Sequence, residues 1–346
     1  DRAIQIAKPN SGIQTFIVPD SFLLGRYFSK VRNWILKNDE IDAILLLPYS
    51  VFDATVGFSV VYCFRRETIV EHKHLISARF AENNEQISKS NYKRFNYLQS
   101  YFEHTKYNRF RLFFNKETMN LVNKVESGHR ELGTIVRFSS GLIGKNGQEK
   151  IINKKSLSTK WRPGIISGSE IKKYVIKPDG MFLLYDKDEI KSGYESVDYF
   201  SEKLFIRQTG DSLICAYDNR GLLALNNVHI GNANNPQYEL KFVVSIINSK
   251  LINWYYKVIS LEAGRVMAQT DIETIESLPI REVSKQDQKP FIEIVDKILA
   301  ITKSDDYLQN EAKQKKVKEY EHQIDEVVYK LYGLTEDEIK VIRKSA

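Results

Sequence analysis

The segment from Arg137 to Lys173 concentrates the positive charge of this 346-residue chain. The segment contains nine cationic residues and only two acidic ones, Glu149 and Glu170. Nine minus two gives a net charge of +7, which equals that of the whole chain. The cations are Arg137, Lys145, Lys150, Lys154, Lys155, Lys160, Arg162, Lys172 and Lys173. Frequent Gly, Ser and Asn predict looped backbone here. Lysines on loops can neutralise phosphates and arginine can pair with base edges. On charge alone, a solvated surface face explains the segment equally well.

A second pattern of residues that could carry out chemistry is Pro178-Asp179 followed by Glu189-Ile190-Lys191. Metal-dependent nucleases use this arrangement, with two carboxylates on the metal and a lysine that polarises the attacked phosphate. The pattern is degenerate, however, and the charged run Asp186–Glu189 is typical of a solvated turn. We therefore favour the turn and predict no metal site.

The elements that would position such residues begin with three apolar runs, at residues 16–23, 41–48 and 51–64. Each is short, rich in β-branched residues and ended by Pro, Asp or Gly, which predicts buried strands. Between the first two, Val31, Trp34 and Ile35 recur at helical spacing. A strand, a helix, a strand and then a hairpin is how a doubly wound α/β sheet ends.

The amino-acid sequence of these runs resembles the last motifs of N6-adenine DNA methyltransferases of the TaqI-like and type IIG restriction–modification kind. The family pattern V-F-x(5)-G/S-x(5)-F falls on Val51, Phe52, Gly57 and Phe64. The resemblance implies that Phe64 stacks on the adenine that such enzymes rotate out of the duplex. Phe58 or Tyr62 could take that role, or Phe64 could be a core residue.

The motifs that precede these in the family are absent. The sequence contains no N-P-P-Y or D-P-P-Y and no F-x-G-x-G turn, and it opens at Asp1 rather than Met. The resemblance assigns the target amino group to the first motif and S-adenosylmethionine to the second. We therefore expect the C-terminal part of a longer enzyme, inactive alone, with S-adenosylmethionine bound in the missing N-terminal region. Magnesium is expected only if a nuclease domain lies upstream.

A second resemblance covers residues 132–280. Five motifs follow the order of a target-recognition domain, as found in TaqI-like methyltransferases and type I specificity subunits. They are L-G-T-I-V-R-F-S-S-G-L-I-G, R-P-G-I-I-S-G-S-E-I-K-K-Y, E-K-L-F-I-R-Q-T-G, F-V-V-S-I-I-N-S-K-L-I-N-W-Y-Y and I-E-T-I-E-S-L-P-I. The implied partner is double-stranded DNA. The expected DNA-binding residues are Lys145, Lys150, Lys154, Lys155, Arg162, Lys172, Lys173, Arg207 and Arg265. For Arg207 and Arg265 a structural ion pair is an equal alternative.

The remaining chain predicts connecting and supporting elements. Residues 89–114 interleave aromatic and basic side chains, which could stack bases of single-stranded nucleic acid; we favour a linker whose rings pack on the flanking domains. Two amphipathic helices, a Gly333 cap and a Thr335–Glu338 capping box predict a helical tail. Hence residues 1–70 would end the methyltransferase domain, 71–131 connect, 132–283 recognise the target, and 284–346 form a spacer.

Composition agrees with an intracellular protein of two or three domains. Hydrophobic residues make up 42% of the chain, yet no apolar run approaches the roughly 20 residues of a membrane helix. Cys63 and Cys215, the only cysteines, lie in apolar runs and predict reduced thiols in the cytoplasm.

The expected fold class is thus α/β and α+β. It would comprise the terminal strands and helix of a Rossmann-like methyltransferase sheet, a mixed recognition domain and C-terminal helices. A separate, non-catalytic specificity subunit remains the alternative, although such a subunit has no use for the methyltransferase hairpin.

Overall fold

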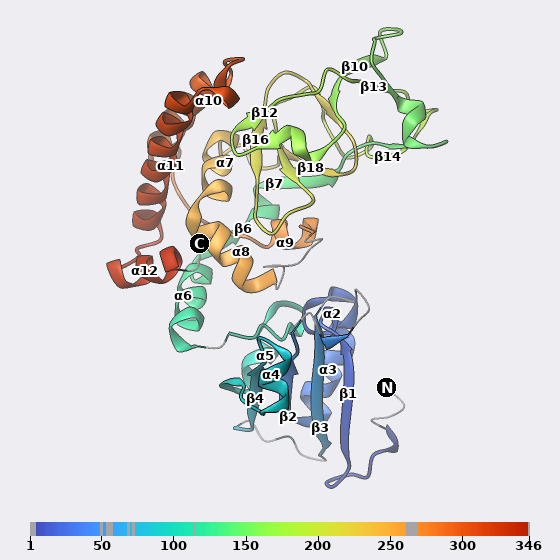
Figure 1. Ribbon diagram of the computed structural model, residues 1–346, viewed down its shortest axis with the longest axis vertical. Coiled ribbons are helices and arrows are strands. Elements are labelled where there is room, and N and C mark those ends of the chain that lie inside the picture. The colour runs from blue at the N-terminus through green and yellow to red at the C-terminus, as the bar shows by residue number, and fades with distance from the viewer. Residues whose placement is uncertain are drawn as a thin grey trace. The chain divides into compact units, whose positions relative to one another are not determined.

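The computed structural model describes residues 5–48, 51–52, 58–67, 70, 73–113, 115–260 and 269–344, and its contacts divide the chain into two units, Asp1–Asn120 and Leu121–Ala346 (Figure 1). None of the described helices is long and apolar enough to cross a membrane.

The first unit is built on a five-stranded sheet with the order β1-β3-β2-β4-β5. The strands are β1 (Ile13–Pro19), β2 (Asp39–Leu46), β3 (Ser59–Arg66), β4 (Leu75–Phe80) and β5 (Lys93–Leu98). Strand β3 lies antiparallel between β1 and β2, whereas β2 and β4 are parallel. Strands β1 and β2 cover most of the predicted strands at 16–23 and 41–48, although the first run ends in a short helix at Ser21–Leu24. Of the predicted strand at 51–64, residues 59–64 are confirmed as part of β3, and residues 53–57 lie outside the described residues.

Helix α3 (Ser29–Asn38) occupies the predicted helical stretch and connects β1 to β2. Its Arg32 is fully buried and donates hydrogen bonds to the carbonyl oxygens of Phe22 at 2.7 Å, Gly25 at 2.8 Å and Asn108 at 2.9 Å. Burial lowers the pKa of Arg32 to about 10, with a smaller effect from Arg109. The guanidinium thereby ties the short helix α2 (Ser21–Leu24) and a distant loop to α3.

The segment expected to connect the domains contributes two strands to this same sheet. Strand β5 pairs with β4, and short helices α4 (Asn84–Ser88) and α5 (Gln99–Glu103) flank it. The interleaved aromatics include Tyr97, Phe102 and Phe110, all at most 2% exposed. Phe102 packs edge-on against Phe110 at 5.1 Å between centroids. These rings are core, as favoured, because an apolar face is needed under the added strands.

The second unit contains several small sheets. One has the order β16-β15-β18-β7 and another β17-β10-β13-β9, with three two-stranded pairs beside them. The bounds are β6 (His129–Glu131), β7 (Val136–Ser140), β8 (Ile143–Gly144), β9 (Ile152–Asn153), β10 (Trp161–Ile165), β11 (Ile171–Lys172), β12 (Val175–Ile176), β13 (Phe182–Leu184), β14 (Ile190–Ser192), β15 (Lys203–Arg207), β16 (Cys215–Asp218), β17 (Leu223–Ala224), β18 (Val228–Ala233) and β19 (Pro279–Arg281). A shared core of fully buried residues such as Leu142, Leu183 and Phe205 joins the two larger sheets.

Helices α7 (Leu240–Asn248) and α8 (Lys250–Ser260) pack on these sheets and break at the predicted Asn248-Ser249 position. The Asn248 amide accepts from the backbone N of Cys215 at 3.0 Å and donates to its carbonyl oxygen at 2.8 Å. The break therefore places a side chain that fastens the helices to the edge of β16.

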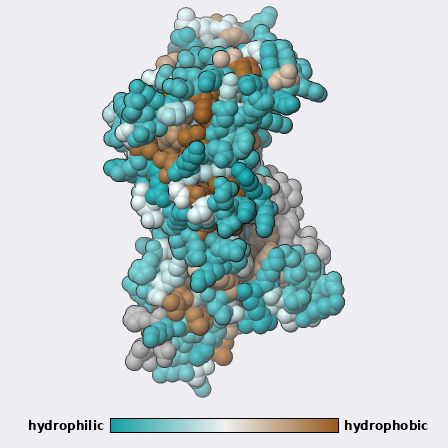
Figure 2. Space-filling model, turned by 90° about the vertical axis from the view of Figure 1, so that its left-hand side faces the viewer, coloured by the Kyte–Doolittle hydropathy of each residue, from teal (hydrophilic) through white to brown (hydrophobic). Residues whose placement is uncertain are grey.

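The predicted helical tail is confirmed. Helices α10 (Lys285–Thr302), α11 (Glu311–Leu331) and α12 (Glu336–Lys344) follow a shorter α9 (Ile272–Glu276), and α6 (Lys116–Glu126) lies where the two units join in sequence. Gly333 has a positive φ of 64°, and the backbone N of Thr335 donates to Glu338 at 2.7 Å. Viewed from this helical side, the surface is largely hydrophilic with scattered apolar patches (Figure 2). The fold is thus mixed α/β with several sheets and C-terminal helices.

Candidate nucleic-acid interface

The β9–β10 region carries the densest group of the predicted DNA-binding residues. Lys154 and Lys155 follow strand β9, and Arg162 lies in β10; all three side chains are exposed. Strand β13 lies between β9 and β10 and pairs with both, so it holds the two cationic segments two strands apart. This lobe forms one end of the second unit, opposite α10 and α11 (Figure 1).

Lys145 and Lys150 are also exposed, on the turn after β8. This turn is held by Gln148, which accepts from the backbone N of Gly144 at 2.7 Å and donates to Asn226 at 2.9 Å. Gly147 adopts a φ of +109°, which favours glycine because a Cβ would be strained there. The two lysines therefore project from a fixed turn.

Lys172 is exposed as well, but it belongs to another part of the unit. It follows a loop fixed by Glu170, whose carboxylate accepts from the backbone N of Ile166 at 2.8 Å, of Ser167 at 2.7 Å and of Asp179 at 3.0 Å. A small cavity of about 210 Å³ beside Lys172 is closed by Leu308, from the α10–α11 connection. The structure thus separates Lys172 from the β9–β10 group.

Lys173 makes a structural contact, and Arg207 is partly buried. The Nζ of Lys173 donates to the carbonyl oxygen of Asn248 at 2.8 Å, and burial lowers the pKa of this lysine although Glu321 and Asp325 of α11 oppose the shift. Arg207 is half-buried in β15, with its Nε enclosed. Lys173 therefore helps to seat α11, and the DNA-binding role of both residues stays a prediction.

Phe64 lies in the sheet core of the first unit, with 1% of its surface exposed, and stacks on Tyr62 at 4.1 Å between ring centroids. Its base-stacking role stays a prediction. Phe52, the other phenylalanine of the same motif, is 43% exposed. Arg265 and Gly57 lie outside the described residues.

The nuclease-like pattern is placed in surface turns. Asp179 is exposed, and the backbone N of Glu189 donates to the carbonyl oxygen of Asp186 in the predicted charged turn. The Asp186 carboxylate pairs with Lys160, and this contact lowers the pKa of Asp186. Within the part of the chain that the structure describes, no group of three or more His, Cys, Asp or Glu is arranged to hold a metal.

One exposed residue of the lobe was not anticipated from the sequence. Phe200 is 55% exposed, and the guanidinium carbon of Arg162 lies 5.9 Å from the centroid of its ring. The signal in the sequence is alternation: Val197 and Tyr199 are buried, whereas Asp198 and Phe200 face outward. The outward phase of this stretch leaves the Phe200 ring accessible for contact.

Residues 164–280 match the sequence model of the TaqI-like C-terminal specificity domain. The match ends at Ile280, where the last of the five recognition motifs ends. The resemblance to a TaqI-like specificity domain that the sequence predicts is therefore confirmed for these residues. No curated protein matches the chain.

Solved structures extend the likeness beyond this domain. The type IIL restriction-modification enzyme MmeI, solved in complex with DNA, aligns with a TM-score of 0.55 and 11% identity, over 96% of this chain and 49% of MmeI. The type IIG restriction endonuclease BpuSI aligns with a TM-score of 0.37 and 13% identity, over 95% of this chain and 48% of BpuSI. The HsdS subunit from Thermoanaerobacter tengcongensis gives a TM-score of 0.33 and 9% identity, over 62% of this chain and 50% of that subunit.

The chain spans about half the length of BpuSI and MmeI. The alignment with MmeI covers nearly the whole chain and shows a likeness of fold.

Proposed function

We propose that this chain is the DNA-recognition portion of an S-adenosylmethionine-dependent N6-adenine DNA methyltransferase from a restriction–modification system. The observation that carries the proposal is the specificity domain at residues 164–280, together with the exposed cations that lie within and just before it. Cations on fixed turns suit a phosphate backbone, because each neutralised phosphate releases a counterion and strengthens binding.

The first unit supports the methyltransferase part of the proposal. Strands β1 and β2 run in the same direction, and the chain passes through helix α3 between them. Strand β3 lies between these two strands and is antiparallel to both. This is an arrangement that a Rossmann-like methyltransferase sheet could have at its end. No residue of this chain is assigned to hold S-adenosylmethionine, because the sequence lacks the glycine-rich and N-P-P-Y motifs.

Strand β1 is also the place where the rest of such a sheet would dock. Among the described strands it pairs with β3 alone, and it exposes Ile13 by 65%, Phe16 by 42% and Ile17 by 50%. An uncovered apolar edge strand is unusual in a protein that works alone, since it invites pairing with another chain. We propose that the catalytic N-terminal region of the parent enzyme, with S-adenosylmethionine, covers this edge.

Fluorescence anisotropy with duplex DNA across a salt series tests the proposal. Binding by the wild-type chain should weaken steeply with salt, and Lys154→Ala/Lys155→Ala should lower the slope of log K against log salt by about 0.9 for each lost phosphate contact. The double variant Lys315→Ala/Lys318→Ala removes the same charge from α11, where both lysines are exposed, and should leave the slope near the wild-type value. A wild-type chain that binds no duplex at low salt would refute the proposed function.

A further inference from the structure

Large apolar side chains are exposed at only two positions in the second unit, among its described residues. These are Leu157, which is 64% exposed in the β9–β10 connection, and Phe200, which is 55% exposed in the loop before β15. Both lie in segments next to Arg162, since Leu157 precedes β10 and Phe200 lies under the Arg162 guanidinium. The apolar exposure of this unit is therefore gathered at the cationic lobe, where a polyanion is expected to bind.

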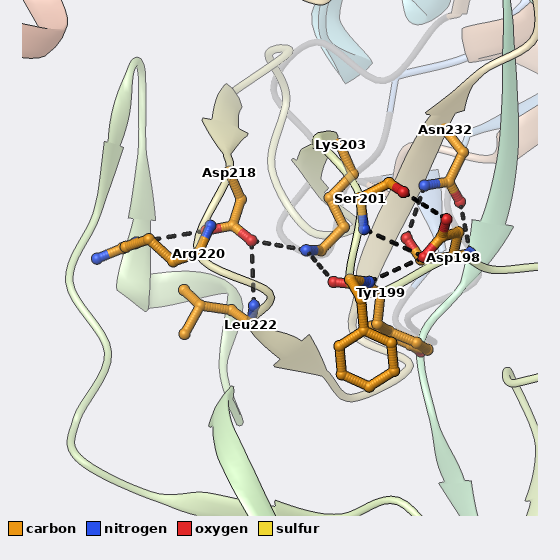
Figure 3. Close-up of polar contacts among 9 residues, drawn as sticks. Asp198, Tyr199, Ser201, Lys203, Asp218, Arg220, Leu222 and Asn232 are labelled. Atoms are coloured by element: carbon orange, nitrogen blue, oxygen red, sulfur yellow. Dashed lines mark hydrogen bonds and ion pairs between the residues drawn. The ribbon is translucent and has the colours of Figure 1, made fainter.

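Phe200 lies in a turn. The backbone before Phe200 is held by hydrogen bonds of Asp198. The carboxylate of Asp198 accepts from the backbone N of Phe200 at 2.9 Å and of Ser201 at 3.1 Å. Asn232 of β18 clamps Asp198 in turn, donating to its carbonyl oxygen at 2.8 Å and accepting from its backbone N at 3.0 Å (Figure 3).

The other side is fixed by a buried ion pair. Lys203 and Asp218 are both fully buried, and Nζ of Lys203 donates to the Asp218 carboxylate and to the carbonyl oxygen of Tyr199, each at 2.6 Å (Figure 3). Asp218 also accepts from the backbone N of Leu222 at 3.1 Å. The Asp198 contacts on one side and the fully buried Lys203–Asp218 pair on the other together hold the turn in one geometry.

The Phe200 ring itself is supported along one edge and open elsewhere. Tyr185 contacts it edge-on, with centroids 5.5 Å apart and planes at 90°, and the Arg162 guanidinium lies over it at 5.9 Å. Gly221, with a φ of +72°, lies close beside the ring, since a Cβ built on it would be in ordinary contact with Phe200 Cδ1 at 3.7 Å. A rigid, half-exposed ring beside an arginine has the preorganisation that recognition surfaces need.

We propose that Phe200 is a specificity-determining residue that contacts the C5 methyl group of a thymine in the major groove, next to a base pair read by Arg162. This inference rests on the proposed DNA-binding function. The thymine methyl is the one apolar group that the base pairs offer in that groove, and an aromatic ring is a suitable partner for it. Arginine suits guanine, whose O6 and N7 accept two hydrogen bonds from one guanidinium. The pair would therefore favour a thymine adjacent to a guanine.

The experiment replaces thymine by uracil, which removes only the methyl group. A bound sequence is first selected from a random duplex pool by the full 346-residue chain, and each thymine of that sequence is then replaced singly. We expect one replacement to weaken wild-type binding about fourfold, the effect of burying one methyl group. Phe200→Ala should bind the thymine and uracil duplexes equally, and, because the ring is exposed, it should unfold at nearly the wild-type temperature.

Tyr320→Ala is the matched control. Tyr320 lies on α11, where Lys316 stands 5.1 Å from its ring centroid, so this variant also removes an aromatic ring that contacts a cation. It should keep the wild-type preference for thymine over uracil.

Each other outcome has a definite meaning. A wild-type chain that selects a sequence but ignores every uracil replacement overturns this inference and leaves the proposed function intact. A Phe200→Ala variant that retains the thymine preference also overturns it. If that variant binds both duplexes more weakly by the same factor, the ring acts as a wedge between bases instead. Failure of the wild-type chain to select any sequence would refute the proposed function, and this inference with it.

Discussion

Removing the buried Lys203 ammonium should strongly destabilise the second unit. In Lys203→Met, the fully buried Asp218 carboxylate would keep the backbone N of Leu222 at 3.1 Å and both the backbone N and the Nε of Arg220, each at 3.3 Å. The Tyr199 carbonyl would lose its donor. Breaking a buried pair on one side costs about 3–5 kcal/mol. Because Arg220 is 50% exposed and can partly compensate, we expect about 3 kcal/mol, or roughly 6–12 °C in melting temperature for a unit of this size.

Urea unfolding followed by tryptophan fluorescence measures this loss. Trp161 and Trp254 belong to the second unit and Trp34 to the first, so a Trp34→Phe background restricts the signal to the second unit. Lys340→Ala is the control, because it breaks an exposed pair with Asp337 in the same unit and should cost less than about 1 kcal/mol.

The double variant Lys203→Met/Asp218→Asn separates the charge effect from lost packing. It leaves no uncompensated charge, so it should be more stable than Lys203→Met alone, although the introduced carboxamide would still have to accept from the backbone N of Leu222. A single variant that loses less than about 1 kcal/mol, or a double variant at least as unstable as the single one, would refute the reasoning.

Two further predictions concern the first unit. Burial raises the pKa of Asp39 to about 6 against the opposing effect of Arg66. Because this folded-state pKa lies above the unfolded value, the free energy of unfolding should fall as pH rises from about 4 to about 6. Asp39→Asn should abolish that decline and stabilise the unit by about 1–3 kcal/mol at pH 7, which urea unfolding at about pH 4 and pH 7 measures. Phe64→Ala should lower the unfolding free energy by about 3–5 kcal/mol because the ring is fully buried, whereas Phe52→Ala should cost under about 1 kcal/mol because its ring is 43% exposed. Equal unfolding midpoints for the two variants would contradict this.

Local patterns carried most of the fold that could be predicted. The helix break at Asn248-Ser249 and the Thr335–Glu338 capping box are set by neighbours in sequence, so they can be predicted from spacing alone. The role of residues 75–98 as part of the first sheet could not, because it depends on the parallel pairing of β4 with β2, a contact between segments some thirty residues apart.

The sequence predicted which residues could form the candidate site, but not how those residues are arranged in space. Charge density located Lys154, Lys155 and Arg162, all of which are exposed. It could not separate Lys172 from Lys173, although one is exposed and the other reaches α7, because Lys172 ends β11 and Lys173 lies in the turn after it, where the fold sets the direction of the side chain. Phe200 was missed because its partner Arg162 lies 38 positions away and meets it only through the fold.

The pairing of β6 with β19 has a consequence for how such proteins change over time. Glu131 lies opposite Pro279 and His129 opposite Arg281, so the chain enters and leaves the specificity domain at adjacent points. A cassette with adjoining ends can be exchanged for another of the same span without altering the distance between the segments on either side. Under the proposed function, recombination at these two strands would supply a new target preference in one step, while the sheet of the first unit and the terminal helices are inherited unchanged.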